Sequence, residues 1–351
     1  MKIIKIFFYN FLVLFTFIIL FEIFFGYWFD KDNFGPYMRE HRMKNQRIEW
    51  SDEKEKIVYF YRKNYYGFRG EDTKPSDIDA IIMGGSVIDE RYKPEKYTIT
   101  GFLNKKLEKE FNIKLTNAGS EGQSTKGMVL SFKNWLFKLD DFKPKFILFY
   151  IGLNDTILKE SRNEKKIIPD GHLLNPEKKE ILIDNIKSRS ILYDSIRIFK
   201  FKYLPREGFV KYDGKISAGY KKKFNNTYDF IDFDKAEKMY DAKKLQEKYK
   251  NKIKNYLHRI DMLYKFSKDI GSIPIFITGI DSYGYIEALY MLHSELITHC
   301  KLKNYNCLDM AKNINGKAEY WRDGTHTTKE GSNIFADEIY IELKEILAKH
   351  N

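Results

Sequence analysis

The stretch KFILFYIG, at residues 145–152, is apolar throughout its centre and lies between two stretches with helical periodicity. A strand with apolar side chains on both faces has to be covered on both faces, which is typical of a parallel sheet between layers of helices. Other short apolar runs in the chain also alternate with amphipathic stretches. We therefore expect an α/β fold: a doubly wound (flavodoxin-like), five-stranded parallel sheet in a three-layer α/β/α arrangement.

The pattern predicts five strands and five principal helices. The strands are expected at residues 78–83, 113–119, 145–152, 272–279 and 306–310. The helices are expected at residues 98–111, 126–139, 234–270, 285–301 and 329–349. Residues 156–235 are polar and rich in Lys and Tyr, and we interpret them as an insertion carried on the domain. Loops on a rigid scaffold commonly shape specificity, so the insertion is a candidate for that role.

The N-terminal stretch from Lys5 to Phe29 is almost wholly apolar, and it is long enough for a helix to cross a bilayer. Lys2 precedes it, aromatic residues follow at its end, and no small-residue cleavage motif is present. We interpret residues 1–29 as an uncleaved transmembrane signal anchor with the amino terminus inside. Residues 30–60 are then expected to be a juxtamembrane linker, and residues 61–351 a single domain that contains the insertion.

The 351 residues carry a net charge of +12, which raises the question of nucleic-acid binding. The basic residues are spread along the whole chain and form neither a compact basic arm nor a zinc-finger pattern. A generally basic, solvated surface therefore explains the charge, and no nucleic-acid partner is expected. Cys300 and Cys307 lack the second half of a zinc site, and the sequence leaves open whether they form a disulfide or remain thiols.

Four of the expected strands are followed by residues that can take part in catalysis. The first ends at Gly84-Gly85-Ser86, the second at Gly119 and the third at Asn154-Asp155, while Asp323 and His326 follow the fifth. Because parallel strands deliver their carboxyl ends to one edge of the sheet, we expect these side chains to meet there.

Together these residue types suit acyl transfer. A neighbouring imidazole activates a serine hydroxyl, and a carboxylate fixes the orientation of the imidazole. We expect Ser86 to be the nucleophile, His326 the base and Asp323 its orienting partner. The N–H groups of Ser86 and Gly119 and the side-chain amide of Asn154 are the expected oxyanion hole.

Each residue also has an ordinary interpretation. Ser86 and Gly119 could serve only as turn residues, and Asn154-Asp155 could cap the following helix. His326 could be a structural histidine. The pair Asp170 and His172, in the insertion, is interpreted as a surface turn. Three further histidines fall on predicted helices and are given no role: His258, His293 and His299.

The blocks GGS, NAGSEG, GLND and DGTH, in this order, resemble those of the SGNH hydrolase (GDSL esterase/lipase) superfamily. The upstream NYYGFRG, residues 64–70, is similar to a segment found in a membrane-anchored bacterial branch with a Gly-Gly-Ser serine block. Gly85 stands where an aspartate is common in the superfamily. The resemblance implies a Ser86–His326–Asp323 triad and an oxyanion hole at Ser86, Gly119 and Asn154.

The resemblance implies a membrane-anchored serine esterase with a domain outside the cytoplasm of a bacterium. It acts on ester-linked acyl groups, with O-acetyl groups of a cell-surface glycan or its precursor as the favoured substrate. A sugar O-acyltransferase, a lipid esterase or thioesterase, and a non-catalytic glycan-binding or scaffold protein remain alternatives. No cofactor or metal is expected, because the sequence contains neither a Walker-type nor a Gly-x-Gly-x-x-Gly loop.

Overall fold

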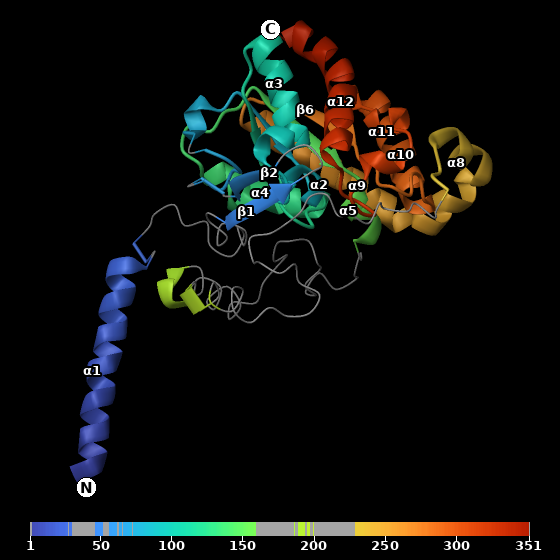
Figure 1. Cartoon of the computed structure of the whole chain (residues 1–351). Helices are drawn as coiled ribbons and strands as arrows, with labels where there is room; N and C mark the ends of the chain where they lie inside the picture. The colour runs from blue at the N-terminus through green and yellow to red at the C-terminus, as the bar shows by residue number, and fades with distance from the viewer. Residues whose placement is uncertain are drawn as a thin grey trace.

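The computed structural model describes residues 2–26, 28–29, 46–51, 56–61, 63–64, 66–71, 73–158, 186, 189–193, 195–196, 199 and 229–350. Its centre is a parallel sheet with the order β4-β3-β5-β6-β7 (Figure 1). The strands are β3 (Ala80–Met83), β4 (Leu115–Asn117), β5 (Phe146–Ile151), β6 (Ile273–Thr278) and β7 (Asn306–Leu308). In chain order this is 2-1-3-4-5, so the chain changes direction between β3 and β5, where ligands bind in such sheets.

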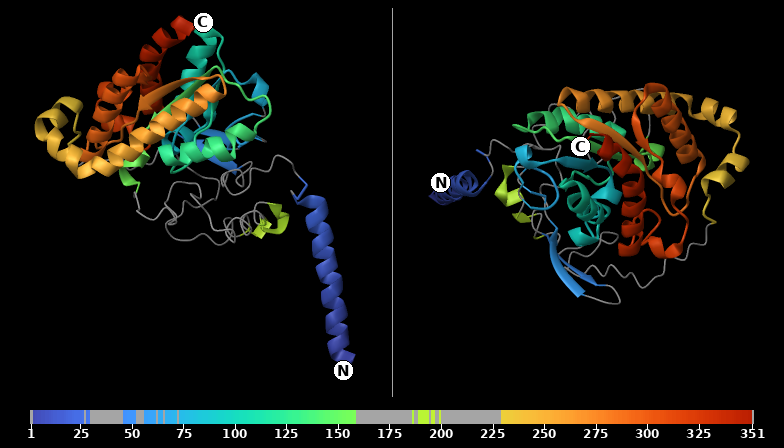
Figure 2. Two further views of the ribbon diagram at one scale, coloured as in Figure 1. Left: turned by 180° about the vertical axis from the view of Figure 1, so that it is seen from behind. Right: turned by 90° about the horizontal axis from the view of Figure 1, so that it is seen from above.

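Helices cover both faces of the sheet. On one face α3 (Ile99–Phe111) packs against α12 (Lys329–His350). On the other, α9 (Ala242–Asp269) packs against α4 (Thr125–Asn134) and α10 (Glu287–Lys303) (Figure 2). The central strands β3 and β5 are buried along their whole length, as their apolar sequences require. The predicted five-stranded α/β/α fold is confirmed.

Shorter elements complete the described part of the domain. Four short α-helices are α2 (Ser86–Asp89), α5 (Leu153–Ile157), α8 (Phe233–Met239) and α11 (Met310–Asn313). Four 3₁₀ helices are η2 (Pro75–Asp77), η3 (Glu95–Tyr97), η4 (Leu136–Lys138) and η5 (Ala318–Tyr320). Of these, α2 and α5 directly follow β3 and β5, so they begin at the carboxyl edge of the sheet.

One sequence-based prediction needs correction, and one stretch contains strands that the sequence analysis did not predict. The single helix expected at 234–270 is two helices, because Asp241 accepts hydrogen bonds from the N–H groups of Lys243 and Lys244 and so starts α9 anew. The linker expected at 30–60 contains an antiparallel pair, β1 (Gln46–Ser51) and β2 (Lys56–Tyr61). Most of the insertion, with Asp170 and His172, lies outside the described residues.

The apolar N-terminal stretch forms α1 (Lys2–Phe25), drawn apart from the α/β domain in Figure 1. Its window from Ile4 to Phe25 is long and apolar enough to cross a membrane, and none of it is buried inside the protein. Glu22, near its end, accepts hydrogen bonds from the Ser190 hydroxyl (2.6 Å) and the Leu192 N–H (3.1 Å). The helix therefore contacts a described part of the insertion.

Cys300, in the last turn of α10, and Cys307, in β7, form a disulfide. This settles the alternative that the sequence leaves open. The bond connects a helix of one outer layer to the edge strand β7, so it fixes this corner of the domain.

Candidate active site

The two glycines before Ser86 are required by close packing. A Cβ on Gly84 would collide with the side chain of Ile88 in α2, and a Cβ on Gly85 would collide with the amide nitrogen of Asn154. Gly85 also precedes α2, and no side chain caps the first N–H groups of this helix. Gly84-Gly85 thus lets the chain turn sharply from β3 into α2, with Ser86 at the turn.

The structure brings Ser86, His326 and Asp323 together in one chain of hydrogen bonds. The Ser86 Oγ lies 2.9 Å from His326 Nε2. His326 Nδ1 lies 2.9 Å from each carboxylate oxygen of Asp323. Such an arrangement places the unprotonated Nε2 toward the serine hydroxyl when Nδ1–H donates to the carboxylate.

The position of Asp323 is set by its own loop. Its Oδ1 also accepts hydrogen bonds from the backbone N–H groups of Thr325 (2.9 Å) and His326 (2.8 Å). Partial burial by itself raises the pKa of Asp323, but the hydrogen bonds from the His326 side chain and from these backbone groups outweigh it. The net effect holds the pKa below its usual range. Asp323 is therefore ionised wherever His326 can act as a base.

Two of the three expected oxyanion-hole residues, Ser86 and Asn154, line the same hollow. Within the described chain the Ser86 N–H has no acceptor, since it lies in the first turn of α2. The Asn154 amide donates one hydrogen bond to the carbonyl of Gln123 (2.9 Å) and packs against Gly85. Its second N–H remains available beside Ser86.

The prediction for Gly119 needs correction. Its N–H donates to Asn117 Oδ1 (2.9 Å), so it is already engaged in a hydrogen bond. Gly119 is instead required for packing, because a Cβ there would lie 2.5 Å from the backbone nitrogen of Asp89. The Asn117 side chain that accepts this bond also donates to the carbonyl of Ile88 (2.7 Å), and so ties the strand to α2.

Gly122 is a candidate donor that the sequence reasoning missed. It occupies the third position of a turn closed by a hydrogen bond from the Gln123 N–H to the Ser120 carbonyl (3.1 Å), and its φ is +72°. Among the described residues its N–H has no acceptor. Asn154 binds the carbonyl of the adjacent Gln123, so this turn lies next to the oxyanion side of the site. The signal was the second glycine in NAGSEG.

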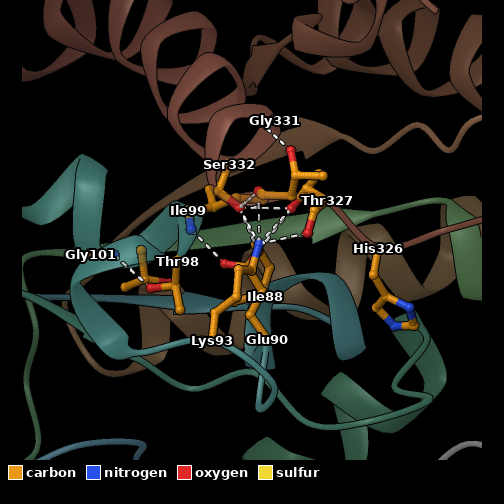
Figure 3. A network of polar contacts seen from close by, with 12 residues as sticks. Ile88, Glu90, Lys93, Thr98, Ile99, Gly101, His326, Thr327, Gly331 and Ser332 are labelled. Atoms are coloured by element: carbon orange, nitrogen blue, oxygen red, sulfur yellow. Dashed lines mark hydrogen bonds and ion pairs between the residues drawn. The ribbon is translucent and has the colours of Figure 1, made fainter. Parts of the chain in front are cut away.

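A buried ion pair, also missed, joins the serine-bearing and histidine-bearing segments. The Lys93 ammonium contacts the Glu90 carboxylate and lies 2.9 Å from both the carbonyl and the hydroxyl of Thr327. The hydroxyls of Thr327 (2.9 Å) and Ser332 (2.8 Å) donate to Glu90 Oε1. Figure 3 shows Lys93 and Glu90 directed into this group, while the ring of His326 points away from it. We call these four residues the Lys93 cluster.

The NYYGFRG segment and β2 support α2 from behind. The Arg69 guanidinium donates to the carbonyls of Asp89 and Lys93 (2.6 Å for the latter). The buried Asp89 carboxylate lies 3.1 Å from Lys63 Nζ and accepts a hydrogen bond from the Tyr61 hydroxyl (2.8 Å). Burial raises the pKa of Asp89, but the nearby cations Lys63, Arg91 and Arg69 outweigh it and lower the pKa overall.

Asp155 has a structural role, but it does not cap the helix that follows it: it lies inside α5, whose N-cap is Gly152. It accepts a hydrogen bond from the Thr125 hydroxyl (2.5 Å) at the start of α4 and lies 3.4 Å from Arg259 of α9. His293 is buried behind Gly152, and neither of its ring nitrogens has a hydrogen-bond partner in the described chain. The residues that the structure describes contain no cluster of His, Cys, Asp and Glu that could hold a metal ion.

Two hollows flank Ser86. We call the first the amide-side hollow, which is lined by Gly85, Gln123, Tyr150, Asn154 and Thr325. The second, the imidazole-side hollow, is lined by Asp89, Glu90, Arg91, Tyr92, Lys93, Glu121, Arg322, His326 and Thr327. Ser86 borders both, so a carbonyl attacked by its Oγ can place its two substituents in different hollows.

No protein-family model matches the sequence, and no curated protein matches it. Solved structures do match. A psychrotrophic esterase EstA from Pseudoalteromonas sp., inhibited by monoethylphosphonate, is 14% identical at a TM-score of 0.42, over 77% of this chain and 99% of that chain. A GDSL-like lipase from Bacteroides thetaiotaomicron is 11% identical at a TM-score of 0.39, over 78% and 88%.

A member of the lipolytic G-D-S-L family from Veillonella parvula is 12% identical at a TM-score of 0.41, over 75% of this chain and 97% of that chain.

Proposed function

We propose that this chain is a membrane-anchored serine esterase of the SGNH hydrolase type. The observation that carries the proposal is the continuous hydrogen-bond chain from Ser86 through His326 to Asp323, at the carboxyl edge of a doubly wound sheet. Turn residues or a structural histidine would not need this order of groups, nor N–H donors directed to the same serine.

In the proposed reaction His326 Nε2 takes the proton from the Ser86 hydroxyl as Oγ bonds to the ester carbonyl carbon. The carbonyl oxygen becomes an oxyanion, which the N–H groups of Ser86 and Gly122 and the amide of Asn154 stabilise. The carbon–oxygen bond to the alcohol then breaks, and the His326 imidazolium returns the proton to the leaving alcohol. Water repeats the sequence on the acyl-enzyme and releases the acid.

The proposed substrate is a short acyl ester, with acetyl favoured, on a cell-surface glycan or its precursor. The amide-side hollow supports a short acyl group, because residues of β5 and α5, among them Tyr150 and Asn154, line it beside Ser86. If a sugar hydroxyl replaces water in the second half-reaction, the same residues transfer the acyl group. A preference for long acyl chains would instead favour the lipid esterase or thioesterase alternative.

We further propose that residues 1–29 anchor the enzyme and that the α/β domain lies outside the cytoplasm. The exposed apolar α1 and the basic residues Lys2 and Lys5 before it support an anchor with its amino terminus inside. The disulfide between Cys300 and Cys307 supports an oxidising compartment for the domain.

Labelling with a fluorophosphonate, followed by mass spectrometry of the full chain in uncharged detergent, tests the nucleophile without knowledge of the substrate. We expect one adduct, on Ser86, that is lost in Ser86→Ala and in His326→Ala. A folded protein without an adduct would refute the esterase and favour the non-catalytic scaffold. Release of acetate from acetylated glycans, compared with release of long acyl chains, then tests the substrate.

A further inference from the structure

The imidazole-side hollow is the side on which the alcohol part of an ester would lie. Acyl transfer requires that His326 Nε2 first takes the serine proton and then gives it to the leaving alcohol oxygen. The alcohol oxygen therefore has to be within reach of Nε2, and His326 borders only this one of the two hollows described above. The oxyanion donor Asn154 lines the other hollow.

Three basic and three acidic residues line the imidazole-side hollow: Arg91, Lys93 and Arg322, with Asp89, Glu90 and Glu121. The carboxylates around it are already engaged in ion pairs. Glu90 pairs with Lys93, and Asp89 lies between Lys63 and Arg91.

Asp323, beside the hollow, faces His326 Nδ1. The remaining wall carboxylate, Glu121, reaches Arg91 (2.5 Å) from an exposed position. Every carboxylate that lines the hollow is therefore already paired with a cation, so none of them repels an entering anion as an unpaired carboxylate would.

Arg322 is placed to bind such an anion. It lies one residue before Asp323, and its backbone N–H donates to the His326 carbonyl (2.8 Å), so its main chain is fixed relative to the catalytic histidine. The guanidinium packs over the ring of Tyr92, with Cζ 4.6 Å from the ring centroid. An arginine stacked on an aromatic ring is restricted in orientation and suits planar, bidentate contact with an oxyacid group.

We propose that the alcohol part of the substrate carries an anionic oxyacid group, a carboxylate or a phosphate, that Arg322 binds in the imidazole-side hollow. This deepens the proposed function, on which it rests. In a glycan substrate, the acylated sugar would be an acidic one. The anion would position the ester oxygen against His326 Nε2, so its binding contributes to both KM and kcat/KM.

Three acetate esters with related leaving groups test the proposal: phenyl acetate, 4-acetoxybenzoate and 4-acetoxyphenyl phosphate. We compare kcat/KM for each between the full-length enzyme and Arg322→Gln, because the ratio between enzymes cancels the intrinsic reactivity of each ester. We expect a loss of about ten- to a hundredfold for an anionic ester, as for a lost charge-assisted hydrogen bond, and a loss under about threefold for phenyl acetate.

The matched control is Lys317→Gln, which removes one charge nearby in the chain, where Lys317 packs on Tyr320 and does not line the hollow. It should leave all three ratios near those of the unmodified enzyme. The relative losses of the carboxylate and the phosphate ester show which anion the site takes. Equal effects of Arg322→Gln on all three esters, or equal effects of the two variants, would overturn the proposal.

A measurement on the unmodified enzyme keeps the test independent of the folding of the variant. Benzoate should inhibit phenyl acetate hydrolysis competitively, with an inhibition constant at least tenfold lower than that of benzyl alcohol, because only benzoate carries the anion. Equal inhibition would overturn the anion site. Failure to hydrolyse any of the esters, together with no fluorophosphonate adduct, would refute the esterase itself, and the two failures are therefore distinguishable.

Discussion

Lys93→Met should loosen the contact between the segment that carries Ser86 and the segment that carries His326. The Lys93 ammonium is buried and contacts Glu90, Thr327 and Ser332. Methionine keeps much of the side-chain volume but has no charge, and the buried Glu90 carboxylate then keeps only hydroxyl and N–H donors. Removing one partner of a buried ion pair costs about 3–5 kcal/mol.

The cost should be visible both in stability and in activity. For a chain of this size, a loss of about 3–5 kcal/mol corresponds to a fall in Tm of roughly 10 °C. Thr327 follows His326, and Glu90 follows α2, so loss of the cluster also loosens the imidazole relative to Ser86. A misplacement of about 1 Å costs about a hundredfold in rate. We expect the rate of fluorophosphonate labelling of Ser86 to fall by that order.

A double-mutant cycle with Glu90→Gln distinguishes the ion pair from loss of packing. Each single variant leaves one buried charge unpaired, whereas the double variant leaves none, so the double variant should be more stable than the sum of the single effects by about 2 kcal/mol or more. Tm from the fluorescence of the buried Trp135 and Trp321 is the assay. Additive effects, or a Lys93→Met protein as stable as the unmodified chain, would refute the reasoning.

Three further substitutions have expected outcomes. Asn154→Ala should lower kcat by about a hundred- to a thousandfold with little change in Tm, as for loss of an oxyanion donor, and ester hydrolysis measures it. Gly152→Ala should lower Tm and activity together, because φ is +108° and the new Cβ would lie 2.5 Å from His293 Nε2; wild-type values would contradict this packing. Burial lowers the pKa of His293 to about 3 from 6.5, so the unfolded chain binds the proton preferentially and stability falls as pH drops from about 6.5 toward 3. Between pH 7 and pH 5 the unmodified protein should therefore lose about 2 kcal/mol of unfolding free energy relative to His293→Leu, which lacks this titration. Denaturant unfolding measures the difference between the two proteins at each pH. An unchanged difference would show that His293 does not titrate in this way.

The strands and the position of the site could be predicted because each depends on a local pattern. An apolar run such as 145–152 can only be a buried strand or a short buried helix, and the following glycine and polar residues mark its carboxyl end. The doubly wound rule then places Ser86, Asn154 and His326 at one edge without knowledge of any contact. The assignment of a serine and a histidine to the site needed no more than this.

The remaining features depend on contacts between distant residues. The choice between Gly119 and Gly122 as donor depends on the turn that follows β4, since Asn117 engages the first and a positive φ exposes the second. The Lys93 cluster joins residues more than two hundred positions apart, and a lysine and a glutamate three residues apart look like ordinary surface charges. The β1–β2 pair was missed because the charged sequence of β1, QRIEWS, resembles a linker, although the run KIVYFY of β2 is typical of a strand.

The contacts of Lys63 and Arg69 with the segment after Ser86 also decide where the chain could be cut without loss of function. Proteolysis between α1 and Gln46 would release a domain that keeps every contact to α2 described above. A cut between Arg69 and β3 would instead detach the cations that hold Asp89 and the end of α2. In the proposed membrane-anchored enzyme, the position of a cut relative to residues 63–69 therefore sets the difference between release of an active domain and inactivation.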